Sequence, residues 1–371
     1  MNIYTLVFIS SYMISIFKVN KYFKQVSLSL LILFLTTSYT SGSDWRAYEL
    51  MYKYFDLGNF YNSHSEKGFA LYVALNKYIF SNFWYFFIIN KLIIAYIFNL
   101  TIKKYYKNNL LVWSIFFPAA AVYLFIDCPF RNLLAIGIYL YAIKYIKLNR
   151  LKYFCIILFG FFFHKSILIV GLVSIINFSK FKRKILGIIL IVELGLSFQI
   201  NKIIEMFKFI PIYGRQISIY SVTNYFDGKI LTIGMIEKLI IAGILIFYKN
   251  KILKDKDEKL FNFTYIYLLF YILAVKIPIL TRFVYYIQIF YLIFICYAIK
   301  DILKIKILYV FVFLYYLLIT PKLMYNSYMK YDTYLMYFFR EIPYKIRMKM
   351  NNKEHREEHS KEIFLREDRK K

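Results

Sequence analysis

Three arginines of this 371-residue chain stand at the starts of apolar runs or in a loop between them. Arg131 opens the run "FRNLLAIGIYLYAIKYI", Arg282 opens "RFVYYIQIF", and Arg215 lies in "IPIYGRQISIY". A guanidinium can make two parallel hydrogen bonds to phosphate oxygens, and a helix N-terminus also favours anions. The three residues therefore predict a site for an anionic headgroup such as a phosphate. The alternative for Arg131 is an anchor at the membrane interface.

His164, in "FFFHKSILIVG", is the only histidine in the apolar part of the chain. It follows Lys152 by twelve residues, which is about 18 Å of helix, whereas the hydrocarbon core of a membrane is about 30 Å thick. We therefore expect His164 to line a wet cavity below the outer interface, as a proton acceptor or a hydrogen-bond donor to phosphate. The alternative is a structural histidine bonded to a backbone carbonyl.

Two acidic residues are the other candidates for proton transfer. Asp44 lies in "SGSDWRAY" (41–48) and Glu66 in "EKGF" (66–69), which are short polar stretches where chemistry can meet water. Either residue could instead order its loop. For Asp44 this would be an Asx turn or the cap of a helix over "WRAYELMYKYF".

The elements that must position these residues are membrane helices. The chain is 60% hydrophobic and 19% charged, whereas a soluble domain carries about a quarter charged residues. Apolar runs separated by lysine-bearing gaps are typical of a polytopic helical membrane protein. We expect an all-α fold with about twelve transmembrane helices (10–13), at roughly 2–17, 26–40, 83–101, 109–125, 131–146, 153–163, 165–178, 185–200, 231–248, 260–275, 283–299 and 307–320.

The formal net charge of +28 follows the gaps between the runs. Such a charge would suggest nucleic acid in a soluble protein, but here it predicts topology and no nucleic-acid partner. Alternate gaps are strongly basic, so the positive-inside rule makes them cytoplasmic. Residues 41–68 and 201–230 are then outside and 179–184 inside. The first run lacks a basic leader and a small-residue cleavage site, so we interpret it as a retained span.

Two segments depart from this regular pattern. Residues 153–178 are too few for two full spans, so we expect two short helices that meet at "HKS". Residues 321–371 form a polar C-terminal segment after a transmembrane domain at 1–320, and within it 350–371 has the composition of a disordered tail or frayed helix.

The chain offers little for a metal. "HREEH" (355–359) fits the H-x-x-E-H pattern of inverted zinc proteases, but nothing around it could form the core that such a site needs, so no metal is expected. Cys128, Cys155 and Cys296 show no metal spacing and no pairing signature, and we interpret them as packing residues.

Four stretches, in this order, resemble EpsG-like, Wzy-type polysaccharide polymerases: "SGSDWRAYELMYKYF", "EKGFALYVALNKYIF", "FRNLLAIGIYLYAIKYI" and "FFFHKSILIVG". Those proteins are multi-pass membrane glycosyltransferases of bacterial surface-glycan pathways. The resemblance covers about residues 25–180 well. It marks Asp44 and Tyr48 of a G-x-D-x-x-x-Y pattern, Glu66 and Gly68 of an E-x-G pattern, Arg131, and His164 with Ser166. Many relatives have an arginine a few residues before the aspartate, and here either Arg46 substitutes or that contact is absent.

The resemblance implies an activity and a location. The enzyme would have a GT-C-like architecture in the bacterial inner membrane, with its active site facing the periplasm. It would transfer a growing glycan from undecaprenyl diphosphate to a sugar hydroxyl on a second lipid-linked repeat unit. A flippase and a chain-length regulator would be its protein partners.

The resemblance also implies roles for individual residues. Arginines could neutralise the diphosphate without a metal, so no cofactor is expected. Glu66 or Asp44 would be the base, and His164 would share that role or hold phosphate. The diphosphate would be bound by Arg131 and Arg282, with Arg215 as a third contact. The aromatic residues Trp45 and Tyr48 would stack on sugars.

Two other classes compete with this interpretation. The first is a lipid-linked oligosaccharide flippase or another transporter, which would show internal repeats and charges at the membrane midplane. The sequence shows no repeat, and the charges singled out gather at one face. The second is a related O-antigen ligase or an acyltransferase. Because a ligase shares the carrier and leaving group of a polymerase, only the family resemblance separates them.

Overall fold

The computed structural model describes residues 2–42, 44–54, 66–199, 232–277, 280–321 and 331–337, together with Arg340, Pro343 and Arg347. Within these residues every named element is helical, and one isolated antiparallel bridge joins Ser38 to Thr333. The predicted all-α class is confirmed.

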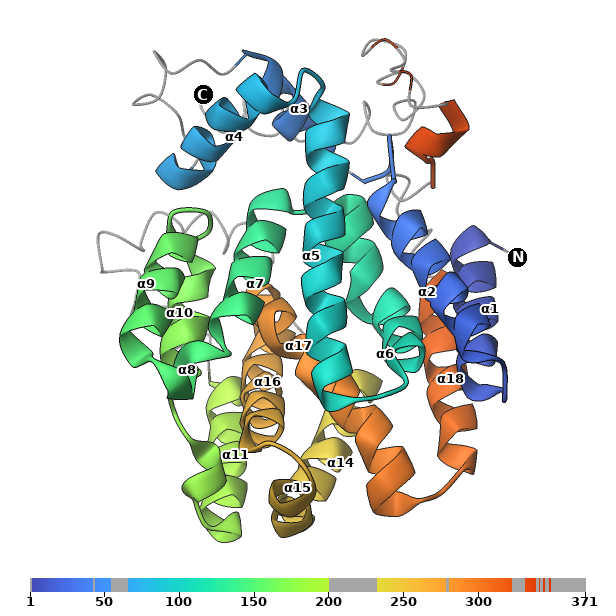
Figure 1. The fold of residues 1–371 in the computed structure, drawn as a ribbon. Coiled ribbons are helices and arrows are strands. Elements are labelled where there is room, and N and C mark those ends of the chain that lie inside the picture. The colour runs from blue at the N-terminus through green and yellow to red at the C-terminus, as the bar shows by residue number, and fades with distance from the viewer. Residues whose placement is uncertain are drawn as a thin grey trace, which may run out of the picture. The chain divides into compact units, whose positions relative to one another are not determined.

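The chain forms two compact units, and Figure 1 shows their helices. The first unit lies within Met1–Leu100, Asn108–Gly137 and Ile307–Lys371, and the second within Thr101–Lys107 and Ile138–Lys306. The elements that begin in the first unit are α1 (Ile3–Ile16), α2 (Lys21–Thr36), α3 (Trp45–Tyr54), α4 (Lys67–Ile79), α5 (Phe83–Tyr105), α6 (Asn109–Phe116), η2 (Phe117–Ala121), η3 (Tyr123–Asp127), α7 (Phe130–Ala142), α18 (Ile307–Ile319) and η9 (Tyr334–Tyr337).

The second unit is built around a helix pair, α16 and α17, whose side chains are buried along most of their length. The rings of Tyr267 and Tyr291 stack across this pair with their centroids 4.3 Å apart. The unit contains α8 (Tyr145–Leu148), α9 (Arg150–Phe161), α10 (Ser166–Val173), η4 (Phe178–Lys180), α11 (Arg183–Phe198), α14 (Ile233–Phe247), α15 (Lys249–Asp255), α16 (Glu258–Lys276), α17 (Thr281–Tyr297) and η6 (Ala298–Leu303).

Each of the twelve apolar runs overlaps a helix. Among the described residues, three helical segments are long and apolar enough to cross a membrane, namely Phe83–Tyr105, Glu258–Lys276 and Thr281–Leu303. Shorter apolar helices are Ile3–Ile16, Asn109–Ala121, Phe130–Ala142, Ser166–Lys180 and Ile307–Ile319. These are features of a helical membrane protein.

The predicted break at "HKS" is confirmed. The helix α9 ends at Phe161 and α10 begins at Ser166, and the two lie side by side in Figure 1. Their close approach depends on Gly171, where an added Cβ would lie 2.8 Å from the side chain of Ile157. The hydroxyl of Tyr153 donates a 2.8 Å hydrogen bond to the carbonyl of Gly171.

Residues 41–68, expected outside the membrane, include α3 and the start of α4. The helix considered as the alternative for Asp44 therefore exists. The helix α3 was hard to predict because it buries a single face, and the residues of this face, Trp45, Glu49 and Tyr52, include a charged one. The packing interpretation of the cysteines holds for Cys128 and Cys296, which are buried, whereas Cys155 is exposed on α9.

Candidate functional site

Arg131 and Glu66 form an ion pair in the first unit, with Nη1 of Arg131 2.5 Å from Oε2 of Glu66. Arg131 is the second residue of α7, as its predicted place at a helix start required. Glu66 occupies the N-cap position of α4, but its side chain makes no capping hydrogen bond there. The carboxylate is directed to Arg131 instead.

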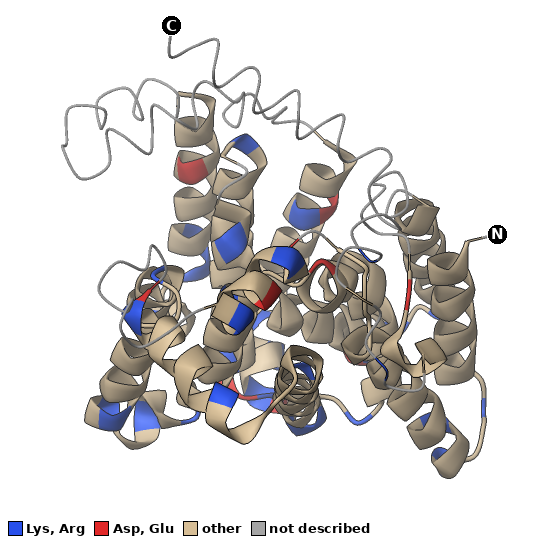
Figure 2. Ribbon diagram, turned by 90° about the horizontal axis from the view of Figure 1, so that it is seen from above, with Lys and Arg blue, Asp and Glu red and all other residues tan. Residues whose placement is uncertain are grey.

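This pair is partly desolvated but accessible. The side chain of Arg131 is 36% exposed and that of Glu66 is 15% exposed, so the two charges attract more strongly than they would in bulk water. Figure 2 shows few acidic positions on the described helices, consistent with 21 Asp and Glu against 49 Lys and Arg in the whole chain. The carboxylate held against Arg131 is thus one of the few acidic groups available to this basic chain.

Tyr48, on α3, contacts Arg131 of this ion pair. The backbone N–H of Arg131 donates to the Tyr48 hydroxyl at 3.5 Å. The Tyr48 ring packs edge-on against Phe69 of α4 and Phe130 of α7, each 5.7 Å away. Burial, followed by the negative charge of Asp44, raises the pKa of Tyr48 above its ordinary value. The phenol therefore keeps its proton at neutral pH and can donate a hydrogen bond.

Asp44 lies just before α3, and its carbonyl accepts a 3.4 Å hydrogen bond from the N–H of Tyr48. Four residues that the sequence patterns marked separately are thus gathered in one unit. We call Asp44, Tyr48, Glu66 and Arg131 the signature cluster.

Gly42 and Lys91 hold the backbone beside the signature cluster. Gly42 has a φ of 87°, and a Cβ added to it would lie 2.4 Å from the carbonyl oxygen of Ile126. Only glycine fits there, which accounts for the first position of the G-x-D pattern.

The Nζ of Lys91, on α5, donates to Ser38 Oγ at 2.8 Å and to the carbonyl of Phe125 at 3.1 Å. The sequence signal that could have identified Lys91 is a lysine inside an expected span, and the structure buries this lysine completely.

Trp45 does not take the place predicted for it as a sugar contact, whereas the substrate-binding role of Arg46 stays a prediction. Trp45 is 1% exposed and its Nε1 donates to the carbonyl of Thr40 at 3.2 Å, so the ring belongs to the core rather than to a sugar-stacking surface. The Arg46 guanidinium carbon lies 5.6 Å from the centroid of that ring.

His164 and Ser166 lie in the second unit, at the turn between α9 and α10. The Nδ1 of His164 and the Oγ of Ser166 are 2.6 Å apart, and that Oγ is 2.9 Å from the hydroxyl of Tyr286 on α17. Arg282 is exposed and lies one helical turn before Tyr286, on the same face of α17. The structure thus pairs His164 directly with Ser166 and links both to Tyr286, a partner that no sequence pattern indicated.

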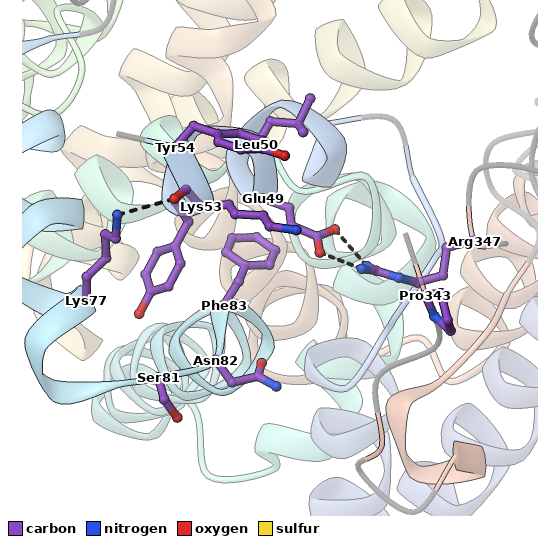
Figure 3. A pocket seen from close by; sticks show the side chains of 11 residues that line it. Glu49, Leu50, Lys53, Tyr54, Lys77, Ser81, Asn82, Phe83, Pro343 and Arg347 are labelled. Atoms are coloured by element: carbon purple, nitrogen blue, oxygen red, sulfur yellow. Dashed lines mark hydrogen bonds and ion pairs between the residues drawn. The ribbon is translucent and has the colours of Figure 1, made fainter. Parts of the chain in front are cut away.

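Two buried ion pairs were also missed. Arg347 Nη1 and Nη2 donate to the two oxygens of Glu49 at 2.7 and 2.5 Å, as Figure 3 shows. In the second unit, Lys238 and Tyr291 both hydrogen-bond to the carboxylate of Glu237.

Some predicted positions lie outside the described residues, namely Arg215, the "HREEH" motif at 355–359, and the whole of 350–371. Across the part of the chain that the structure describes, no group of three His, Cys, Asp or Glu side chains is placed to hold a metal ion.

A family model matches most of the chain and identifies its protein family. The model of the EpsG family matches residues 21–345, which include the signature cluster, His164, Ser166 and Arg282. The chain belongs to the EpsG family.

Membership in the EpsG family supports a polysaccharide-polymerase-like role in general and agrees with the family predicted from the four sequence stretches. No curated protein and no solved structure matches the chain. Within this EpsG-family chain, three of the four stretches meet at the signature cluster and the fourth forms the turn that carries His164.

Proposed function

We propose that the protein is a membrane glycosyltransferase that joins polyprenyl-diphosphate-linked repeat units into a bacterial surface polysaccharide. Its family supports a polymerase-like role in general. The observation that carries the specific proposal is the ion pair of Arg131 and Glu66, because it brings an anion-binding cation and a candidate base together within 2.5 Å.

The reaction requires a sugar hydroxyl to attack the anomeric carbon while the bond from that carbon to the diphosphate oxygen breaks. The diphosphate leaves with the bonding electron pair, and the hydroxyl proton passes to a base. The ion pair with Glu66 uses Nη1 of Arg131, and a guanidinium carries five N–H donors. Arg131 can therefore hold Glu66 and also bind a phosphate oxygen, stabilising the charge that develops on the leaving group.

The other members of the signature cluster support this step. Glu66 takes the proton, with Asp44 as the alternative base. Tyr48, which stays protonated, donates a hydrogen bond to the substrate. His164 and Arg282 belong to the second unit, and the phosphate contacts expected of them stay predictions.

The topology of this proposal follows from charge and helix positions. We propose about twelve spans in a GT-C-like arrangement, although only three described helical segments are long and apolar enough to cross a membrane by themselves. The basic gaps in the sequence are the argument for a periplasmic site in the inner membrane. The carrier would be undecaprenyl diphosphate, and a flippase and a chain-length regulator would act beside the enzyme.

One observation favours a second candidate, a lipid-linked oligosaccharide flippase. The pair of Glu237 and Lys238 lies within the apolar helix α14, and charges inside membrane helices are common in transporters. A flippase defect would trap repeat units on the cytoplasmic leaflet, whereas a polymerase defect would accumulate them outside.

The test is to express Arg131→Ala in cells that lack their own copy of the protein, and to separate the glycans by size. We expect single repeat units on the outer leaflet and no ladder, because losing this contact slows transfer roughly 30- to 1000-fold. Arg131→Lys keeps the charge but loses the planar fork, so it should be impaired. Arg183→Ala, at the exposed start of α11, is the matched control. Normal ladders from Arg131→Ala at wild-type protein level would overturn the proposal.

A further inference from the structure

A pocket of about 600 Å³ opens beside α3 in the first unit, outside the signature cluster (Figure 3). Its volume is within the usual range of about 300–1,000 Å³ for small-molecule sites. Tyr52 lines the pocket and lies one turn of α3 after Tyr48, so the two side chains lie on neighbouring positions of one helix face. The pocket and the signature cluster are therefore adjacent along α3.

The pocket has an excess of positive charge. Of the described residues that line it, Glu49 alone is acidic, and both of its oxygens accept bonds from Arg347. Lys53 of α3 and Lys77 of α4 also line the pocket, and Figure 3 shows Lys77 directed to the Lys53 carbonyl, which its Nζ reaches at 3.4 Å. Because Arg347 already neutralises Glu49, the two ammonium groups favour an anionic ligand.

The rest of the lining suits a sugar better than a lipid. The side chains of Ser81 and Asn82 offer hydroxyl and amide groups, and the ring of Tyr54 is 69% exposed. Among the described lining residues only Leu50 and Pro343 are aliphatic, so the apolar part of the lining is mostly aromatic.

We propose that this pocket binds an acidic sugar of the glycan acceptor, with Lys53 and Lys77 contacting its carboxylate or phosphate and Asn82 its hydroxyls. The acceptor would thereby extend along α3 toward the signature cluster. The glycan part of this inference rests on the proposed function, but binding to the pocket can be measured without polymerisation.

The test uses the full chain in phosphatidylcholine nanodiscs with two tetrasaccharide probes. One contains glucuronic acid, and the other contains glucose at the same position. We expect the acidic probe to bind about tenfold more tightly, the factor that one charge-assisted hydrogen bond supplies. The double variant Lys53→Gln/Lys77→Gln should lose this preference. Lys18→Gln, an exposed lysine of the same unit that does not line the pocket, should keep it.

Three outcomes would overturn the inference: equal binding of the two probes, an unchanged preference in a folded double variant, or displacement of the acidic probe when the nanodiscs contain phosphatidylglycerol. The last would identify a lipid headgroup site. Arg131→Ala should bind the acidic probe normally, so failure of the proposed catalytic step and failure of this pocket give different results.

Discussion

The guanidinium of Arg347 and the carboxylate of Glu49 form a two-bonded ion pair that is almost completely buried, with the Arg347 side chain only 2% exposed. Three aromatic rings surround the guanidinium, with centroids 5.4–5.5 Å from its central carbon, and they belong to Tyr39, Trp45 and Trp84. The pair connects α3, which carries Glu49 and Tyr48, to Arg347, which lies 298 positions after Glu49 in the chain.

Arg347→Ala should strongly destabilise the protein. It would leave the buried Glu49 carboxylate without its cation, which costs about 3–5 kcal/mol in comparable sites. Thermal unfolding of the purified protein in detergent would measure the effect. Arg340→Ala, at an exposed position, is the control. A double variant, Glu49→Met with Arg347→Met, should be less affected than Arg347→Ala, and an Arg347→Ala protein as stable as wild type would show that the pair contributes nothing.

Gly42→Ala should abolish most polymerisation while changing no charged or hydrogen-bonding side chain. The left-handed backbone costs a residue with a Cβ about 1–2 kcal/mol, and the clash with the Ile126 carbonyl would displace the segment that precedes α7 and Arg131. Glycan ladders compared at equal protein level would measure the effect. Gly187→Ala is the matched control, because a Cβ there meets nothing within 4 Å. Equal activity of the two variants would refute the role of Gly42.

Lys91→Met should reduce both stability and activity. Methionine fills a similar volume but cannot donate to Ser38 and Phe125, and the acceptors left unpaired in a buried site cost about 1–3 kcal/mol. Detergent unfolding and ladder length would be measured together, with Lys103→Met, an exposed lysine at the end of α5, as the control. If Lys91→Met matches Lys103→Met in both measurements, Lys91 is not needed to hold these segments.

His164→Ala and Tyr286→Phe should not have additive effects on polymerisation. The Tyr286 hydroxyl reaches His164 through Ser166, so once the imidazole is gone the hydroxyl has nothing to orient. A double-mutant cycle on the polymerisation rate should therefore yield a coupling energy of about 0.5–3 kcal/mol. Strictly additive losses would mean that the two side chains act independently.

The sequence predicted the helices that depend on the composition of a short stretch of residues. Apolar runs became helices because length and hydropathy suffice for them, and the break at "HKS" followed from the 26 residues of 153–178. It also identified Glu66 and Arg131, whose residue types already suggested an ionic site. The partnership between these two residues could not be derived, because it joins positions 65 apart through the packing of three helices.

The burial of Arg347 and Trp45 was not predicted, because it depends on residues that are distant in the sequence. Arg347 stands in a segment of polar composition, and nothing near it indicates burial against Glu49. Trp45 is next to Asp44 in sequence but faces the core, since the buried face of α3 depends on what packs against it. Lys91 was also not predicted, although a lone lysine inside an apolar run is a visible signal.

The long separation of Glu49 from Arg347 also has a consequence for biosynthesis. A ribosome adds about 5–20 residues per second, so the 298 positions between them correspond to roughly 15–60 s of translation. During that interval α3 has already been made, but its carboxylate has no guanidinium to bind. The ion pair that buries Glu49 can therefore form only after nearly every other described helix has been synthesised, which makes it a late step in folding.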